Sequence, residues 1–186
     1  MALSRFLHFQ VLTSTPAVPV KLRPWPGGGV WMEAVVSASD GNWYGYYHNE
    51  RVATVCGNTT KAVPRIGAAR SKDHGATWYD LGIILEASES TFVCNTNNRY
   101  FVGGVGDLSV VLDRSGQFLY VFFSQYGRTV AEQGVGVARM VWGDRDRRVK
   151  QGAGTDKFAG QEARFFMSGR STYIIRFNRR DVPSTR

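Results

Sequence analysis

Short apolar runs separated by polar turns dominate the first 150 residues of the chain. The segments 39–42 and 72–77 carry glycine and aspartate, residues that tight turns favour. No amphipathic helical pattern longer than two turns occurs before residue 150. The pattern therefore predicts an all-β chain. Its strands are expected at 29–36, 43–48, 65–71 and 81–85 in the first half.

An internal repeat is the most informative feature of the sequence. The segment that opens at Glu33 resembles the segment that opens at Asp107, 74 residues later. Each has an acidic residue, an apolar strand, a glycine turn and an aromatic strand. A Gly-x-Ala-Arg strand follows in both copies and ends at Arg70 and at Arg139. Such self-similarity is the mark of a repeat architecture.

The repeated unit predicts a β-propeller built from four-stranded antiparallel blades. We expect about two blades and therefore an incomplete propeller, because closed propellers have about four blades or more. The predicted organisation is a lead-in segment at 1–28, blades at 29–142 (29–86 and 103–142) and an irregular basic tail at 143–186. A fragment, self-association through open sheet edges, or a contribution from the tail would each account for the missing blades.

Charge is distributed unevenly along the chain. The formal net charge is +8, yet residues 139–186 hold 12 Lys and Arg against 5 Asp and Glu, which leaves +1 for the rest. No basic stripe interleaved with aromatic residues follows the patterned part, so nucleic acid is not an expected partner. No stretch approaches the ~18 apolar residues of a membrane span, so no membrane partner is expected either.

The cysteines and the N-terminus bear on the compartment. Cys56 and Cys94 lie in polar segments and would pair if the protein is exported. The apolar run within residues 1–12 is broken by His8 and Gln10 and makes a poor signal peptide. The localisation is therefore open, with the cytoplasm as the default.

One turn carries a family resemblance. Ser71, Asp73, Gly75, Thr77 and Trp78 match the Asp-box, or BNR, motif of sialidases and related propellers. The blade pattern is also similar to that of five-bladed glycoside hydrolases such as family 43. The resemblance implies a structural role for the box: Asp73 accepts backbone N–H groups, Gly75 supplies a positive φ, and Trp78 packs between sheets.

The same resemblance implies catalytic carboxylates at the start of the innermost strands. Glu33 and Asp107 match that position, and Glu50 is a third candidate at the pocket mouth. A carboxylate pair supplies the acid and the base or nucleophile that glycoside hydrolysis needs. The alternative is that each of these residues binds a backbone turn at a strand end.

Four further residues are candidates for binding substrate. His48 and Arg51 flank Glu50 at the strand end, and Trp31 and Tyr46 belong to an aromatic group on which a sugar ring could stack. An ordinary strand-end ion pair and core packing are the alternatives. The Arg-Ile-Pro signature of sialidases is absent.

These residues favour a carbohydrate-active propeller, a glycoside hydrolase relative acting on an oligosaccharide or polysaccharide. A non-catalytic sugar-binding or interaction propeller is one alternative, and an inactive truncated remnant is the other. No organic cofactor is implied, and Ca²⁺ stays open because oxygen ligands suffice for it.

Overall fold

The chain is all-β in the part that the structure describes. The computed structural model describes residues 20–57, 60–127 and 133–146 and the short strands 163–164 and 174–175. Short 3-10 helices at Thr54–Cys56, Glu89–Thr91 and Trp142–Asp144 interrupt the strands. No helix among these residues is long and apolar enough to cross a membrane.

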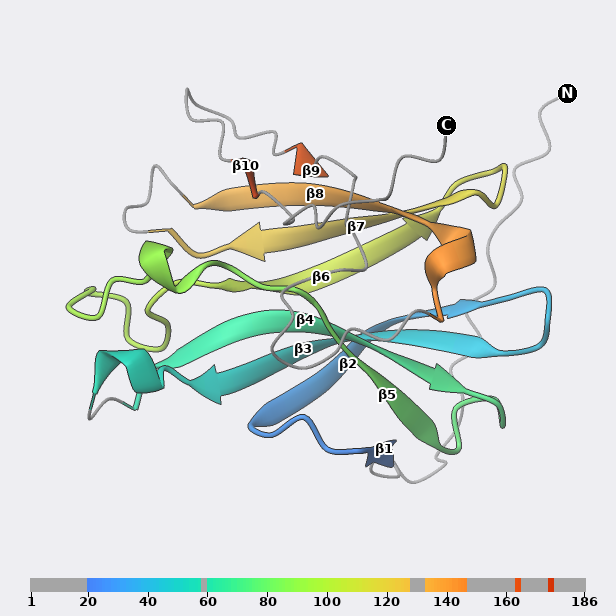
Figure 1. Cartoon of the computed structure of the whole chain (residues 1–186), viewed down its shortest axis with the longest axis horizontal. Coiled ribbons are helices and arrows are strands. Elements are labelled where there is room, and N and C mark those ends of the chain that lie inside the picture. Colours follow the sequence, from blue (N-terminus) through green and yellow to red (C-terminus); the bar gives the residue numbers. More distant parts are fainter. Residues whose placement is uncertain (1–19, 58–59, 128–132, 147–162, 165–173, 176–186) are drawn as a thin grey trace, which may run out of the picture.

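The first sheet is an antiparallel meander of four strands with a short parallel strand added at one edge. Its order is β1-β5-β4-β3-β2 (Figure 1). The strands are β1 Leu22–Arg23, β2 Gly29–Ser37, β3 Trp43–Val52, β4 Ala62–Ser71 and β5 Trp78–Leu85. The added strand β1 comes from the predicted lead-in segment, of which residues 1–19 lie outside the described part.

The second sheet repeats the meander with three described strands. These are β6 Val105–Leu112, β7 Phe118–Gln125 and β8 Gly134–Val141, in the order β6-β7-β8. In the tail, β9 Ala163–Arg164 pairs with β10 Ile174–Ile175 in antiparallel fashion. The remainder of 147–186 lies outside the described residues. Both sheets have the up-and-down topology of propeller blades.

The two sheets pack over a shared apolar core. Alternating side chains of each strand point inward, as the period of two requires. Most of the cluster is completely buried; it includes Tyr44, Tyr46, Ile66, Leu85, Leu119, Val121, Phe123 and Met140. This cluster is the main core that holds the two sheets together, because residues of both contribute to it.

The opposite face of the second sheet carries exposed apolar side chains as well, beside Ser109 and Arg139. Val111, Phe122, Val135 and Val141 share that face by register and are exposed among the described residues. A blade with apolar side chains on both faces is the expected composition when another layer stacks on it.

Asp73 organises the turn between β4 and β5. Its carboxylate accepts the Thr77 backbone N–H at 2.8 Å and the Thr77 hydroxyl at 2.6 Å. The Ser71 hydroxyl donates to the same carboxylate at 2.7 Å and accepts the N–H of Gly75, whose φ is +93°. Trp78 begins β5 and is buried. The hydrogen bonds, led by that of the Thr77 hydroxyl, lower the pKa of Asp73 to about 2.

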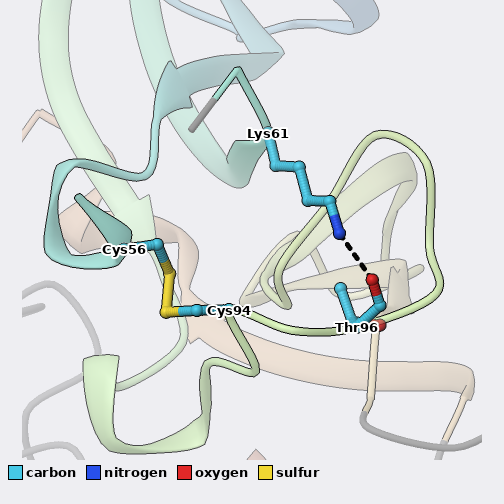
Figure 2. The surroundings of a disulfide bond; sticks show 4 residues. All are labelled: Cys56, Lys61, Cys94 and Thr96. Carbon is cyan, nitrogen blue, oxygen red and sulfur yellow. Dashed lines mark hydrogen bonds between the residues drawn. A yellow bond between two sulfur atoms is a disulfide. The ribbon is translucent and has the colours of Figure 1, made fainter. Parts of the chain in front are cut away.

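A disulfide ties the loop after β3 to the long connection before β6. Figure 2 shows Cys56 bonded to Cys94, 38 residues later, with a Cα–Cα distance of 5.3 Å. Beside it, the Lys61 ammonium donates to the Thr96 carbonyl at 2.5 Å. The pairing that the sequence makes conditional on export is thus formed, and such bonds persist in oxidising surroundings.

We expect removal of the disulfide to destabilise the fold. In the chain-entropy picture, a cross-link closing 38 residues contributes about 4 kcal/mol. Cys56→Ser/Cys94→Ser should lower the free energy of unfolding by about 2–4 kcal/mol in urea titrations. Reductant should bring the wild type to the same midpoint and leave the double variant unchanged. A wild-type midpoint that does not respond to full reduction would contradict this prediction.

We expect Asp73→Asn to weaken the fold in a pH-dependent way. The carboxyl pKa falls from 3.8 to about 2 on folding, so its contribution is present above pH 3.8 and is lost as the pH falls through about 2. Urea midpoints measured from pH 2 to pH 7 should fall less steeply below pH 4 in the variant. Asp144→Asn, which also removes one carboxylate, is the matched control and should keep the wild-type urea midpoint at pH 7.

Candidate functional site

Two β-bulges place the predicted carboxylates. The pairing of β2 with β3 shifts register between Met32 and Ala34, at Glu33. The pairing of β6 with β7 shifts between Gly106 and Leu108, at Asp107. A bulge inserts one residue and redirects its side chain. The two copies of the repeat therefore carry the same irregularity at the same acidic position.

The two bulges are joined by a hydrogen bond between the sheets. The Leu108 backbone N–H donates to Glu33 Oε2 at 2.6 Å. The side chain of Glu33 is 24% exposed, while that of Asp107 is 64% exposed. A carboxylate oxygen of each and a ring nitrogen of His48 lie within 4.8 Å of one another. The structure thus brings together Glu33, Asp107 and His48.

His48 is only 3% exposed, and its Nδ1 lies 3.9 Å from Glu33 Oε1 and 3.6 Å from Asp107 Oδ1. Its Nδ1 accepts the Asp107 backbone N–H at 3.0 Å. A nitrogen that accepts has no proton, so in the neutral ring the proton sits on Nε2. That nitrogen lies 3.2 Å from Glu50 Oε1 and donates to it. The buried imidazole therefore links Glu50 to the Asp107 bulge.

Gly106 leaves the room that the imidazole needs. A Cβ at this position would lie 2.5 Å from both Cε1 and Nδ1 of His48. Real Cβ atoms do not approach so closely, and the imidazole also packs against the Trp31 ring, at a centroid distance of 5.6 Å and an interplanar angle of 82°. The glycine is thus a steric requirement of the site.

Asp107 is held by its backbone and by a tyrosine. Its φ of +43° lies in the left-handed region, which aspartate tolerates better than most residues. The Tyr126 hydroxyl donates a short hydrogen bond to Asp107 Oδ2. Burial, followed by the contact with Asp107, raises the pKa of Tyr126. The phenol therefore stays protonated and serves as a hydrogen-bond donor.

The remaining predicted site residues lie in different surroundings. Trp31 is 51% exposed beside His48. Arg51 pairs with Glu89 at 3.5 Å and lines a separate depression with Arg65. It follows Glu50 directly on β3, and consecutive strand residues point to opposite faces of the sheet.

Tyr46, predicted to bind substrate, is instead 1% exposed in the core between the sheets. Its inward position on β3 makes it a packing residue, and burial raises the pKa of its hydroxyl. We therefore leave Tyr46 out of the site. The Asp73 turn lies at the opposite end of the first sheet from Glu50, because Trp43 pairs with Ser71 and Glu50 with Pro64.

Sequence reasoning missed Tyr126 and Gly106. Tyr126 lies 75 residues after Arg51, at the same place in the second copy, but Arg51 lies outside the site, so the repeat held no signal for Tyr126. Gly106 ends the Gly-Gly-Val-Gly run directly before Asp107, where a close approach of another group would explain a glycine.

The same three groups could offer ligands to a cation. Glu33, His48 and Asp107 provide two carboxylates and one imidazole. The His48 Nδ1 lone pair already accepts the Asp107 N–H, which leaves the two carboxylates as the available ligands. Hard cations such as Ca²⁺ prefer oxygen, so the donor set fits them better than it fits zinc.

No protein-family model matches the chain, and no curated protein matches it. Its structure resembles that of the endo-arabinase from Bacteroides thetaiotaomicron VPI-5482, at 16% identity over 61% of this chain and 38% of that chain, with a TM-score of 0.41. It also resembles a glycosyl hydrolase from Bacteroides ovatus, at 15% identity over 72% of this chain and 36% of that chain, with a TM-score of 0.41. The chain spans less than two fifths of the length of either structure.

We expect Gly106→Ala to disrupt the site. The added methyl must displace His48 or the bulge, and overpacking of this kind costs about 1–3 kcal/mol. Gly143→Ala is the control, because its nearest neighbour would be 3.9 Å away. Denaturant titration of both variants measures the difference. Equal stabilities would show that the close approach of Gly106 to His48 is not required.

Proposed function

We propose that the chain is carbohydrate-active and belongs to a glycoside hydrolase that acts on oligosaccharides or polysaccharides. The observation that carries the proposal is the convergence of Glu33 and Asp107. They are 74 residues apart in sequence, and carboxylate oxygens of the two lie within 4.8 Å. The resemblance of the repeat to glycoside hydrolase blades adds to this support.

The two carboxylates suit different roles. Glu33 accepts the Leu108 backbone N–H, which fixes the position of its carboxylate. It is the candidate nucleophile. Asp107 is the more exposed of the two, and its Oδ2 accepts the Tyr126 hydroxyl, which leaves Oδ1 to carry a proton to the leaving oxygen. Glu50 acts through His48, which holds the Asp107 backbone in place.

The spacing of the pair bears on stereochemistry. Inverting enzymes keep their carboxyl groups about 6.5–9.5 Å apart to admit a water, and retaining enzymes keep them about 5–5.5 Å apart. The closest carboxylate oxygens of the pair lie within 4.8 Å, which is below both ranges and nearer to the retaining one. The geometry therefore favours retention of the anomeric configuration.

Carbohydrate binding without hydrolysis is the second candidate function. The observation in its favour is Trp31, whose ring is half exposed next to the carboxylates and edge-on to His48. A pyranose face can stack on such a ring, and the carboxylates can accept sugar hydroxyls. The aromatic ring would then carry the function and the carboxylates would only orient the ligand.

We expect Glu33→Gln and Asp107→Asn each to lower hydrolysis by at least about 100-fold, the usual contribution of a general acid or base. Reducing-sugar release from a panel of plant and microbial polysaccharides and nitrophenyl glycosides measures this. Proton NMR of the first product gives its anomeric configuration, expected to be retained. Asp144→Asn, which removes a carboxylate outside the site, should keep wild-type activity.

The outcomes separate the candidates. Glycan binding that Trp31→Ala abolishes, with no hydrolysis by the wild type, would replace the hydrolase by the binding function. Hydrolysis that survives both carboxylate variants would overturn the catalytic assignment. An inverted product would overturn the assignment of Glu33 as nucleophile. A chain without cooperative unfolding would indicate an inactive remnant.

A further inference from the structure

A basic groove lies on the outer edge of the first sheet. It holds a volume of about 600 Å³, within the range of small-ligand sites. The cations that line it come from β1 and the residue before it, from the end of β4 and from the turn that follows: Lys21, Arg23, Arg70 and Lys72. Tyr79 of β5 lies among them and is 42% exposed.

The strand register puts these side chains in an ordered row. Tyr79 is paired with Arg23 of β1 on one side and with Arg70 of β4 on the other. Paired residues in neighbouring strands point to the same face, so a guanidinium flanks the phenol ring on each side. The geometry is a flat ring between two forked donors.

Among the described residues, one of the four groove cations forms a salt bridge. Arg70 pairs with Asp146 at 2.7 Å. In the described ranges, no salt bridge involves Lys21, Arg23 or Lys72. Residues 1–138 carry a net charge of +1 with these four cations and −3 without them, so the positive charge of this segment is concentrated at one edge of the first sheet, where it attracts anions.

We propose that this groove binds an acidic saccharide, with a sugar ring on Tyr79 and the carboxylate of a uronic acid unit on Arg23. Guanidinium binds carboxylate in a bidentate manner, and aromatic rings pack against sugar faces. The choice of a saccharide rests on the proposed function. The groove adjoins the Asp73 turn, at the opposite end of the first sheet from Glu50, so it contacts a polymer away from the point of cleavage.

Two carboxylates next to the groove disfavour a nucleic acid strand. Asp146 contacts Arg70, and Asp73 lies beside Lys72 in the same turn. A strand with a phosphate at every nucleotide would meet both of these negative charges. An acidic saccharide in which only some units are uronic acids can place the hydroxyls of its neutral units at these positions.

The test is binding of partly methyl-esterified polygalacturonate, in which only some units are charged, at physiological ionic strength, measured by affinity electrophoresis and calorimetry. Dextran is the neutral control polymer, and single-stranded oligothymidylate represents nucleic acid. We expect Arg23→Ala to weaken polygalacturonate binding by about tenfold, the loss of one charged hydrogen-bonding group. Tyr79→Ala should weaken it as well.

Arg114→Ala is the matched control, because Arg114 is exposed in the β6–β7 turn and carries the same charge. We expect an effect below about twofold, since an exposed distant charge contributes little. An equal loss in both arginine variants would reduce the binding to a general effect of net charge. Tighter binding of oligothymidylate, or no binding of polygalacturonate, would overturn the proposal.

The groove and the catalytic pair can fail separately. Glu33→Gln should lose hydrolysis and keep polygalacturonate binding. Hydrolysis that does not depend on Glu33, with binding that depends on Arg23, would remove the proposed catalytic pair and leave the groove. Hydrolysis that depends on Glu33, with binding insensitive to Arg23, would do the reverse.

Discussion

The hydrogen bond from the Leu108 backbone to the Glu33 carboxylate is the contact on which the candidate site depends. A bulge frees a backbone N–H from its ladder, and an unpaired donor is costly when it is buried. Here the first sheet supplies the acceptors: Glu33 for Leu108 and His48 for Asp107. The same two bonds that satisfy the second bulge therefore set the distance between the carboxylates.

Carboxylates that accept backbone N–H groups recur throughout the chain. Asp73 does so between β4 and β5, and Asp113 does so between β6 and β7, where it accepts the N–H groups of Gln117 and Phe118. Asp40 accepts the Asn42 N–H in the first hairpin. The turns and the candidate site are thus held by the same kind of hydrogen bond, from a backbone N–H to a carboxylate. At the two bulges the carboxylates of Glu33 and Asp107 also lie close to each other, and such a pair can supply an acid and a base.

Much of the fold could be predicted from the sequence. Alternating apolar residues and glycine turns predicted the strands, and the repeat predicted that Glu33 and Asp107 occupy equivalent positions in the two copies. The predicted runs were shorter than the strands; β3 continues to Val52 and β4 begins at Ala62, because pairing with neighbours extends them. Edge strand β1 has only two residues, too few for any periodic signal.

The details of the site were less accessible. Tyr46 and His48 both lie on β3, two positions apart, and alternation alone places them on one face. Tyr46 packs in the core and His48 lies beside the carboxylates. This difference depends on where the second sheet ends over β3, which the local sequence does not determine. The contribution of Tyr126 likewise follows from the path of the chain after β7.

The short strand β1 has a consequence for how the chain folds. Every other pairing in the two sheets joins strands that are neighbours in sequence, so each can form by closing a local hairpin. The contact of Leu22 with Trp78 instead joins residues 56 apart and must close a much longer loop. The basic row across β1, β5 and β4 therefore depends on the one pairing in the two sheets that no local hairpin can form.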